Sequence, residues 1–205
     1  FNCGLYFIRT TAADGLVGIS VSNDRIQFSY PILEKLIAPY LIGRDARDLE
    51  TLLEEVYVHE SNYKLAGIPY FSCLSALELS ILDLLARARQ VSLGLLFGKR
   101  IHDNTDIYVA SGNRHTTAEE ELDILGAEVA RLGARAIKYK IGGRMSRNKD
   151  SLAGRSEDLI YGTRRYFGDE MIIHADGNGS YDARTAIHFG RVMEEIDGYF
   201  YEEPC

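Results

Sequence analysis

The chain has 205 residues, of which 46% are hydrophobic and 26% charged, as in ordinary folded proteins. Its formal net charge of −7 argues against a protein that binds nucleic acid or an anionic membrane, because both partners favour a basic surface. Three distant cysteines (Cys3, Cys73 and Cys205), the lack of an 18-residue apolar run and the lack of a secretory signal pattern predict a cytoplasmic protein with free thiols.

The beginning of the chain predicts a β-hairpin. Residues 5–10 and 16–22 are rich in β-forming residues, and the turn signature TAADG separates them. Gly15 in that turn can adopt the positive φ that tight hairpins require.

Helical patterns follow the hairpin. Apolar residues recur at helical spacing over residues 31–43 and 45–59, with Pro31 at the start of the first helix and Asp45 as the cap of the second. The strongly apolar segment 72–90 predicts a third helix, which we expect to lie in a core.

From residue 106 onward, strands and helices alternate strictly. The predicted elements are, in order, a strand at 106–111, a helix at 117–133, a strand at 136–142, a helix at 156–168, a strand at 170–177, a helix at 182–196 and a strand at 199–204. The expected helix caps are Thr116 or Thr117 for the first helix, Ser156 for the second and Asp182 for the third. The alternation predicts a parallel sheet with right-handed crossovers, either doubly wound or part of a (β/α)8 barrel.

The motifs that are absent help to choose between these two architectures. Neither GxGxxG nor GxxxxGK[ST] follows any predicted strand, which disfavours a nucleotide-binding sheet. The change of pattern predicts two domains: an α+β domain over residues 1–100 and the alternating domain over residues 101–205.

Lys138 and Lys140 share one face of the predicted strand 136–142, and apolar residues occupy the other face. An edge strand protected by lysines is one interpretation, but the alternation places this strand inside the sheet. In a barrel, the apolar face would meet the outer helices and the lysines would point inward. Two ammonium groups about 6–7 Å apart disfavour each other's charged form, so the pKa of one lysine is expected to fall and make it a usable base.

Carboxylates end the next two predicted strands. Asp176 ends one of them, and Glu202 and Glu203 end the other. Active sites of parallel α/β folds lie at the carboxyl ends of strands, so Lys140, Asp176 and Glu202 are predicted at one edge of three successive strands. Carboxylate oxygens at such an edge suit Mg²⁺. Taken singly, Asp176 could be a turn residue and the glutamates a solvated pair, but their joint arrangement favours a site.

Three motifs, in this order, resemble those of the mandelate racemase/muconate lactonizing enzyme family of the enolase superfamily. KYKIG resembles the KxK motif of that family, ADGNGSYD its Asp-x-Asn segment, and YEEP its Glu-Glu-Pro strand end. TTAADGLVGISVS and ALELSILDLLARARQVSLGLLFGK also resemble parts of the family's capping domain and of the helix leading into its barrel. The resemblance implies an N-terminal α+β capping domain followed by the first half of a (β/α)8 barrel.

The resemblance also implies roles for individual residues. Asp176 and Glu202 would be two of three Mg²⁺ ligands. Lys140 would be the base that moves the α-proton of a carboxylate substrate, and Lys138 would tune Lys140 and contact the substrate carboxylate. Asn178 would lie behind the metal ligands or face the substrate. A lysine base with Mg²⁺ stabilising an enediolate intermediate is the general pattern of enolase-superfamily sites.

Further candidates lie around this edge. His174 shares the inward face with Asp176 and could contact substrate, although a hydrogen-bonded core histidine is the more common case. Ser111, at the end of the first barrel strand, could line the pocket. Arg144 is a candidate to bind a second carboxylate or a hydroxyl-rich acid, or else belongs to a solvated loop. The loop 143–155 holds four basic residues: Arg144, Arg147, Lys149 and Arg155.

The function that the resemblance implies is that of an Mg²⁺-dependent lyase or isomerase acting α to a carboxylate. YEEP favours an acid-sugar dehydratase or a 2-hydroxy-acid racemase over a muconate-lactonizing-type cycloisomerase or an epimerase. A non-catalytic ligand-binding barrel, and an unrelated α/β enzyme whose lysines bind phosphate, are the alternatives. We expect a small carboxylate substrate and a homo-oligomer. The family's third metal ligand and second acid/base would follow residue 205, so the chain is expected to be part of a longer barrel protein.

Overall fold

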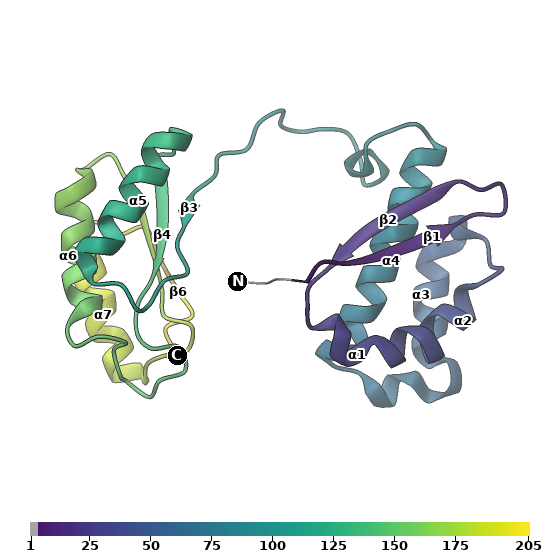
Figure 1. Ribbon diagram of the computed structural model, residues 1–205, viewed down its shortest axis with the longest axis horizontal. Coiled ribbons are helices and arrows are strands. Elements are labelled where there is room, and N and C mark those ends of the chain that lie inside the picture. The colour runs from purple at the N-terminus through teal and green to yellow at the C-terminus, as the bar shows by residue number, and fades with distance from the viewer. Residues whose placement is uncertain (1–3) are drawn as a thin grey trace. The chain divides into compact units, whose positions relative to one another are not determined.

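The computed structural model describes residues 4–205, so Cys3 lies outside the described residues. The chain packs as two compact units, the first ending at Asp103 and the second running from Asn104 to Cys205 (Figure 1). The first unit contains a two-stranded antiparallel sheet and the second a four-stranded parallel sheet. The N-terminal α+β part and the parallel α/β part that the sequence predicts are therefore both present.

The first unit is built from a hairpin and a series of helices. Its elements are β1 (Tyr6–Thr11), β2 (Val17–Ser22), α1 (Ile26–Ile32), a π-helical turn η1 (Leu33–Ile37), α2 (Ala38–Leu41), the 3₁₀ turn η2 (Ala46–Asp48), α3 (Leu49–Val58), the 3₁₀ segment η3 (His59–Leu65), α4 (Ile68–Ala88) and the 3₁₀ turn η4 (Leu93–Leu96). The hairpin register pairs Tyr6 with Ser22 and Thr11 with Val17, as expected from the two β-rich segments.

The helix predicted at 31–43 begins earlier, at Ile26, so placing Pro31 at its start is wrong. Pro31 lies inside α1, where it has no N–H to continue the helical ladder. The π-helical turn η1 follows directly after α1. Asp45 does act as a cap, because its side chain accepts the backbone N–H of Arg47 at the start of η2.

Helix α4 is the core helix of the first unit. Tyr70, Cys73 and Ile81 lie on its buried face. They belong to one apolar cluster with Ile37 and Val56. By length and composition alone α4 could cross a membrane, which the sequence prediction did not anticipate. Its packing within this cluster is that of the central helix of a folded unit.

Gly18 on β2 allows α4 to lie very close to the hairpin. A Cβ at this position would lie 2.1 Å from the carbonyl oxygen of Ser80 and 2.5 Å from the backbone nitrogen of Leu84. Because both are backbone atoms of α4, Gly18→Ala is expected to destabilise the full-length protein by about 1–3 kcal/mol. Calorimetric melting measures this effect, and Gly94→Ala is the control because a Cβ there meets nothing within 4 Å. Equal melting temperatures for the two variants would contradict the expectation.

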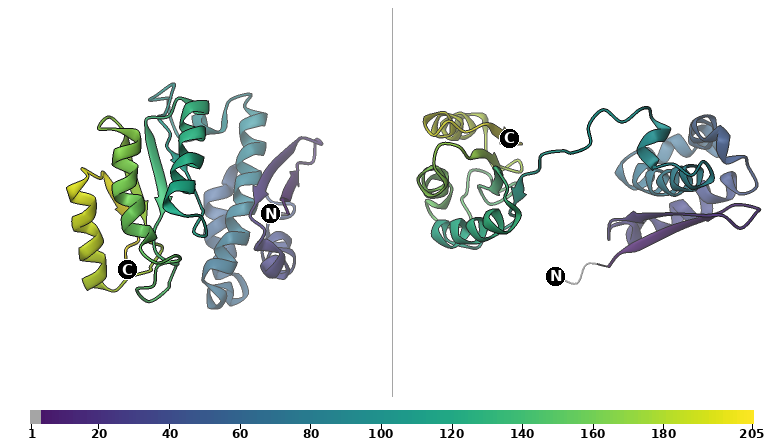
Figure 2. Two further views of the ribbon diagram at one scale, coloured as in Figure 1. Left: turned by 60° about the vertical axis from the view of Figure 1, so that its left-hand side comes forward. Right: turned by 90° about the horizontal axis from the view of Figure 1, so that it is seen from above.

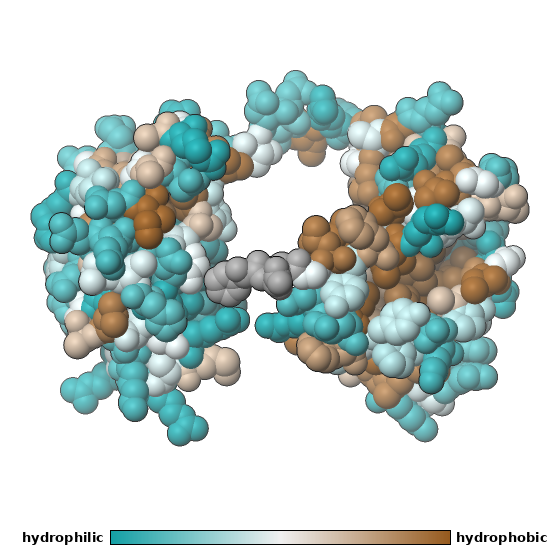
Figure 3. All heavy atoms as spheres, in the orientation of Figure 1, coloured by the Kyte–Doolittle hydropathy of each residue, from teal (hydrophilic) through white to brown (hydrophobic). Residues whose placement is uncertain are grey.

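The outer face of the hairpin is apolar as well. Phe7 and Val21 are direct partners across β1 and β2, and their exposed fractions are 63% and 52%. Ile19, on the same face, is also more than a third exposed. Figure 3 shows the hydrophobic surface of this unit in brown. A hairpin with one solvated face normally carries polar residues there, so this face departs from that pattern.

The second unit alternates strands and helices as predicted. Its elements are β3 (Val109–Ala110), α5 (Ala118–Leu132), β4 (Ala136–Lys140), α6 (Arg155–Phe167), β5 (Ile172–Asp176), α7 (Ala183–Glu195) and β6 (Phe200–Glu202). The strands are parallel and their order is β3-β4-β5-β6. A doubly wound sheet would reverse its order at a switch point, whereas consecutive order is that of a (β/α)8 barrel.

Helices α5, α6 and α7 cover one face of this sheet (Figure 2). Ile137 and Tyr139 of β4 are fully buried against that layer, together with Leu159 and Ile160 of α6. Lys138 and Lys140 alternate with them and therefore belong to the opposite face. The predicted division of β4 into an apolar face and a lysine face is confirmed.

Two details of this unit differ from the prediction. Of the strand predicted at 106–111, only Val109 and Ala110 pair, at the edge of the sheet. Ser156 is not a cap: α6 begins at Arg155 after Gly154, whose φ is 75°. The Ser156 hydroxyl instead lies inside and accepts the backbone N–H of Gly142 at 2.8 Å. The other two expected caps, Thr117 and Asp182, are confirmed.

Candidate active site

The carboxyl ends of β4, β5 and β6 bring three of the predicted residues into one row. Lys140 is in register with Asp176, and Asp176 with Glu202. The preceding row on the same face contains Lys138 and His174. This arrangement follows from consecutive parallel strands, since residues at equivalent positions of each strand lie side by side.

Each lysine is paired with a carboxylate. The Lys140 ammonium donates a hydrogen bond to Asp176 Oδ2. The Lys138 ammonium reaches past β5 and donates to Glu202 Oε2 at 2.5 Å. The Asp176 side chain is 1% exposed, and both lysine side chains are less than a fifth exposed. These charge-assisted bonds lie in a region with little water, where they are stronger than surface ion pairs.

The Glu202 carboxylate determines the protonation of Lys138. From the sequence, repulsion between the two lysines was expected to lower the pKa of one of them. The hydrogen bond to Glu202 raises the pKa of Lys138 instead, and this effect exceeds the opposing effect of burial. Lys138 is therefore not the lysine whose pKa falls, because the Glu202 carboxylate is bonded directly to its ammonium group. Lys138 therefore stays protonated at neutral pH.

Aromatic rings surround the second row. The Lys138 nitrogen lies 5.1 Å from the centre of the Tyr108 ring. The His174 ring lies 5.3 Å from that of Tyr108 and 5.5 Å from that of Tyr199, centre to centre. Burial lowers the pKa of His174, and the charge of Lys138 lowers it further, so the imidazole is neutral at pH 7. His174 thus belongs to a cluster of rings beside Lys138.

Sequence reasoning missed Tyr108. It lies two residues before Ala110, which is in register with Lys138. The same alternation that placed the two lysines on one face would have placed Tyr108 on that face as well.

Asn178 connects the loops at this edge. Its backbone N–H donates to Asp176 Oδ1 at 2.9 Å, and its side-chain amide donates to Glu203 Oε2 at 3.0 Å. Its side-chain oxygen accepts from Arg114 Nη2 at 2.5 Å, and its carbonyl accepts from the N–H of Met145 at 3.0 Å. These partners come from the loops after β3, β4 and β6. Asn178 therefore fixes Asp176 relative to the neighbouring loops.

Arg114 is a second residue that sequence reasoning missed. Burial lowers the pKa of its guanidinium, and Arg144 lowers it further, while Asp176 acts in the opposite direction. Its Nε is buried and has no hydrogen-bond partner within residues 4–205. The structure therefore places a partly buried cation beside Asp176. The only signal for Arg114 in the sequence is that it follows the first predicted strand, because nothing near it indicates the contact with Asn178.

The remaining predicted residues of this edge make backbone contacts. The N–H of Arg144 donates to Ser180 Oγ at 2.9 Å, and its φ is 60°. The N–H of Ser111 donates to the carbonyl of Lys138 at 2.9 Å, and its hydroxyl accepts the N–H of Asn113 at 3.2 Å. Both residues therefore lie at the edge where the sequence placed them.

Arg155 has a different position from the other basic residues of the 143–155 loop. It is the first residue of α6 and is 2% exposed, whereas Arg147 and Lys149 are exposed. A buried guanidinium bound to backbone carbonyls is not free to bind a substrate, so Arg155 does not take the role predicted for Arg144.

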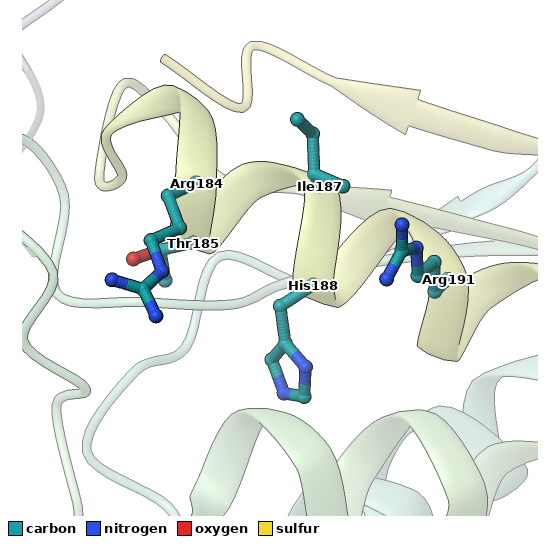
Figure 4. Close-up of a pocket in the computed structure, with 5 residues that line it drawn as sticks. All are labelled: Arg184, Thr185, Ile187, His188 and Arg191. Carbon is teal, nitrogen blue, oxygen red and sulfur yellow. The ribbon is translucent and has the colours of Figure 1, made fainter.

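A surface pocket of this unit lies away from the strand ends. Figure 4 shows its lining side chains, which all come from α7: Arg184, Thr185, Ile187, His188 and Arg191. The pocket contains none of the residues in the Lys140–Asp176–Glu202 row. It is therefore separate from the candidate active site.

The carboxylates of the row fit part of a magnesium site. Asp176 and Glu202 present oxygen donors from adjacent strands, and oxygen donors are what Mg²⁺ prefers. In the part of the chain that the structure describes, no group of three His, Cys, Asp or Glu side chains could hold a metal ion. The described residues thus offer two carboxylates side by side, and Mg²⁺ would need water or further oxygen atoms to complete its coordination.

Two family sequence profiles match this chain. The profile for the mandelate racemase / muconate lactonizing enzyme N-terminal domain matches residues 3–98. The profile for an enolase C-terminal domain-like region matches residues 121–205. Between them the two profiles cover most of both units.

Individual relatives agree with these profiles. The chain is 25% identical to an arabinonate dehydratase from Saccharolobus solfataricus, over 94% of this chain and 50% of the relative. It is 28% identical to an L-Lys-D/L-Arg epimerase from Methylococcus capsulatus, over 96% of this chain and 51% of the relative. A mandelate racemase/muconate lactonizing protein from Paracoccus denitrificans, solved in complex with magnesium, has the same fold, with a TM-score of 0.87 at 23% identity, over 97% of this chain and 53% of that one. The chain thus spans about half the length of the relatives it matches.

Proposed function

The chain belongs to the mandelate racemase/muconate lactonizing enzyme family of the enolase superfamily, and from this we propose that the full-length protein is an Mg²⁺-dependent enzyme that removes the proton α to a carboxylate. The observation that carries the proposal is the row of Lys140, Asp176 and Glu202 at the carboxyl ends of three neighbouring strands. It combines a base with two metal-binding carboxylates at the edge where parallel α/β enzymes act.

In this proposal the two lysines have different tasks. Lys140, as a neutral amine, accepts the α-proton, which converts the substrate into an enediolate. Lys138, whose raised pKa keeps it charged, binds and orients the substrate carboxylate. The neutral His174 and the ring of Tyr108 limit water beside Lys138. Excluding water strengthens the interaction between Lys138 and a substrate carboxylate.

Asp176 and Glu202 would hold the Mg²⁺ ion. When bound, Mg²⁺ supplies Lewis-acid stabilisation of the negative charge that develops on the substrate carboxylate. Asn178 keeps the Asp176 carboxylate oriented through its backbone N–H. Both carboxylates now bind lysines, so metal binding would also release the Lys138 ammonium for the substrate carboxylate. It would release the Lys140 nitrogen as well, which must lose its own proton before it can accept the α-proton.

Acid sugars are the substrates that we propose first. An arabinonate dehydratase is among the relatives, and dehydration of an acid sugar begins with removal of the α-proton. The epimerase relative supports a second candidate, inversion at the α-carbon, which begins with the same step. Arg144 and Arg114 are positioned to bind distant oxygen atoms of such substrates, next to Asn178.

The acidic composition and the small-molecule metabolism of the relatives support a cytoplasmic enzyme. The apolar outer face of the hairpin, with Phe7 and Val21, supports association of several copies.

Proton exchange in D₂O tests the proposed function. The full-length protein is incubated in D₂O with MgCl₂ and one of three acid sugars, arabinonate, gluconate or galactarate, and the α-proton signal is followed by ¹H NMR. We expect the signal to decay with at least one acid, to persist once EDTA removes the metal, and to decay again after MgCl₂ is restored. Exchange that survives EDTA, or no exchange with any of the three acids, would contradict the proposal.

A further inference from the structure

Arg155, the first residue of α6, has a guanidinium buried beneath the carboxyl end of β4. Its side chain is 1% exposed. Nη1 donates to the carbonyl oxygen of Lys140 at 2.9 Å. Nε donates to the carbonyl of Thr116 at 2.6 Å, and Nη2 donates to the carbonyl of Asn113 at 3.3 Å. One side chain therefore fastens the end of β4 to the loop that follows β3.

Within residues 4–205, one carboxylate lies within 4 Å of the Arg155 guanidinium. Its Nη2 lies 3.8 Å from Oε2 of Glu121, a residue of α5 that is 0% exposed. The Thr116 hydroxyl donates to the same oxygen at 2.8 Å. The other oxygen of Glu121 is buried and has no partner among the described residues. Burial lowers the pKa of Arg155, and Glu121 opposes that effect.

A buried ion pair of this kind is a poor way to gain stability, because both charges must leave water. Well-packed apolar residues would serve the start of α6 as well. What apolar residues cannot do is hold several carbonyl groups in one plane, as a guanidinium does. The geometry of the strand end is therefore the property that this pair secures.

We propose that Arg155 is a positioning residue for Lys140, and that the Arg155–Glu121 pair holds the end of β4 where the Lys140 side chain, as a neutral amine, can take the substrate α-proton. This inference rests on the proposed function. The carbonyl that Arg155 binds belongs to Lys140 itself, so a shift of that carbonyl moves the whole residue. Displacements of about 1 Å can reduce the rate of a reaction by about 100-fold.

Arg164 offers a matched control on the same helix. It also binds backbone carbonyls with its guanidinium, but at the other end of α6, near the start of β5. Its partners are the carbonyls of Ile196, Gly168, Asp169, Met171 and Asp197. Arg155 and Arg164 thus make the same type of contact, one at the candidate active site and one remote from it.

The test compares Arg155→Lys with Arg164→Lys in the full-length protein. Melting temperature is measured for both variants, together with kcat and KM for α-proton exchange of the acid sugar on which the wild-type enzyme is fastest. We expect Arg155→Lys to lower kcat about 10- to 100-fold with little change in KM. Arg164→Lys is expected to lower the melting temperature and leave kcat unchanged. Glu121→Gln, which keeps the shape of the partner, should reduce kcat in the same direction and replaces Arg155→Lys if that variant does not fold.

Two results would overturn the positioning role: equal kcat for the Arg155 and Arg164 variants, or a loss that lies only in KM. No exchange by the wild-type enzyme would count against the proposed function instead. In that case the exchange of backbone amide hydrogens tests the positioning role without any substrate. Arg155→Lys must speed amide exchange in peptides 111–117 and 136–143, and Arg164→Lys must not. Unchanged exchange in both peptides would overturn the inference.

Discussion

Lys140→Met in the full-length protein is expected to slow α-proton exchange by about 10²- to 10⁴-fold, the range in which general bases contribute to catalysis. Methionine keeps most of the length of the lysine side chain and removes the group that would accept the proton. Because Lys140 is the residue of β4 in register with Asp176, its side-chain nitrogen would lie beside a substrate bound to a metal ion on that carboxylate. ¹H NMR in D₂O measures the loss directly.

Lys149→Met is the control for this experiment. Lys149 lies in the loop after β4 and is exposed. Its backbone carbonyl accepts the N–H of Gly143 and the hydroxyl of Ser146, and its side chain makes no hydrogen bond among the described residues. The control should exchange the α-proton at the wild-type rate. Retention of wild-type exchange by Lys140→Met would remove Lys140 from the role of base.

Asp176→Asn is expected to abolish stabilisation of the protein by Mg²⁺. A ligand that binds only the folded state at 100 times its Kd raises the free energy of unfolding by about 2.7 kcal/mol. Asparagine keeps an oxygen that can accept the Asn178 N–H, but it loses the charge that attracts the metal. The melting temperature of the wild-type protein should rise with MgCl₂, and that of the variant should not.

Glu170→Gln changes the net charge by the same amount and serves as the comparison. Glu170 is exposed and precedes β5, whereas Asp176 ends that strand. The melting temperature of Glu170→Gln should rise with MgCl₂ as in the wild type. A full magnesium response in Asp176→Asn would exclude this carboxylate as a ligand.

Most of the candidate site could be predicted from the sequence, because it depends on the regular alternation of side chains along parallel strands. Side chains alternate along β4, and parallel strands end at a common edge, so Lys140, Asp176 and Glu202 could be placed together without coordinates. The pairing of charges could not be read in this way. Lys138 bonds to Glu202, two strands away, because a long side chain spans β5, and no spacing in the sequence encodes that reach.

The errors have local causes. Proline is favoured in the first turn of a helix, and Pro69 follows this rule in α4, but Pro31 lies inside α1. The burial of Arg155 depends on Gly154. The left-handed conformation of Gly154 lets α6 begin at Arg155, before Ser156, and Arg155 points inward as the first residue of the helix. Arg114 owes its position to Asn178, 64 residues further along the chain, and that contact has no signature near either residue.

The hydrogen bonds around Asn178 also bear on chemical ageing. An Asn-Gly step in a loose chain loses ammonia readily, because the glycine nitrogen attacks the asparagine side chain and closes a succinimide ring. Here the N–H of Gly179 donates to the carbonyl of Glu203 at 2.7 Å. Arg114 and Glu203 hold the two ends of the Asn178 amide. These hydrogen bonds oppose ring closure as long as the loops stay bonded to one another. Deamidation at Asn178 would therefore be a consequence of the loops at the strand ends separating, and not the cause of that separation.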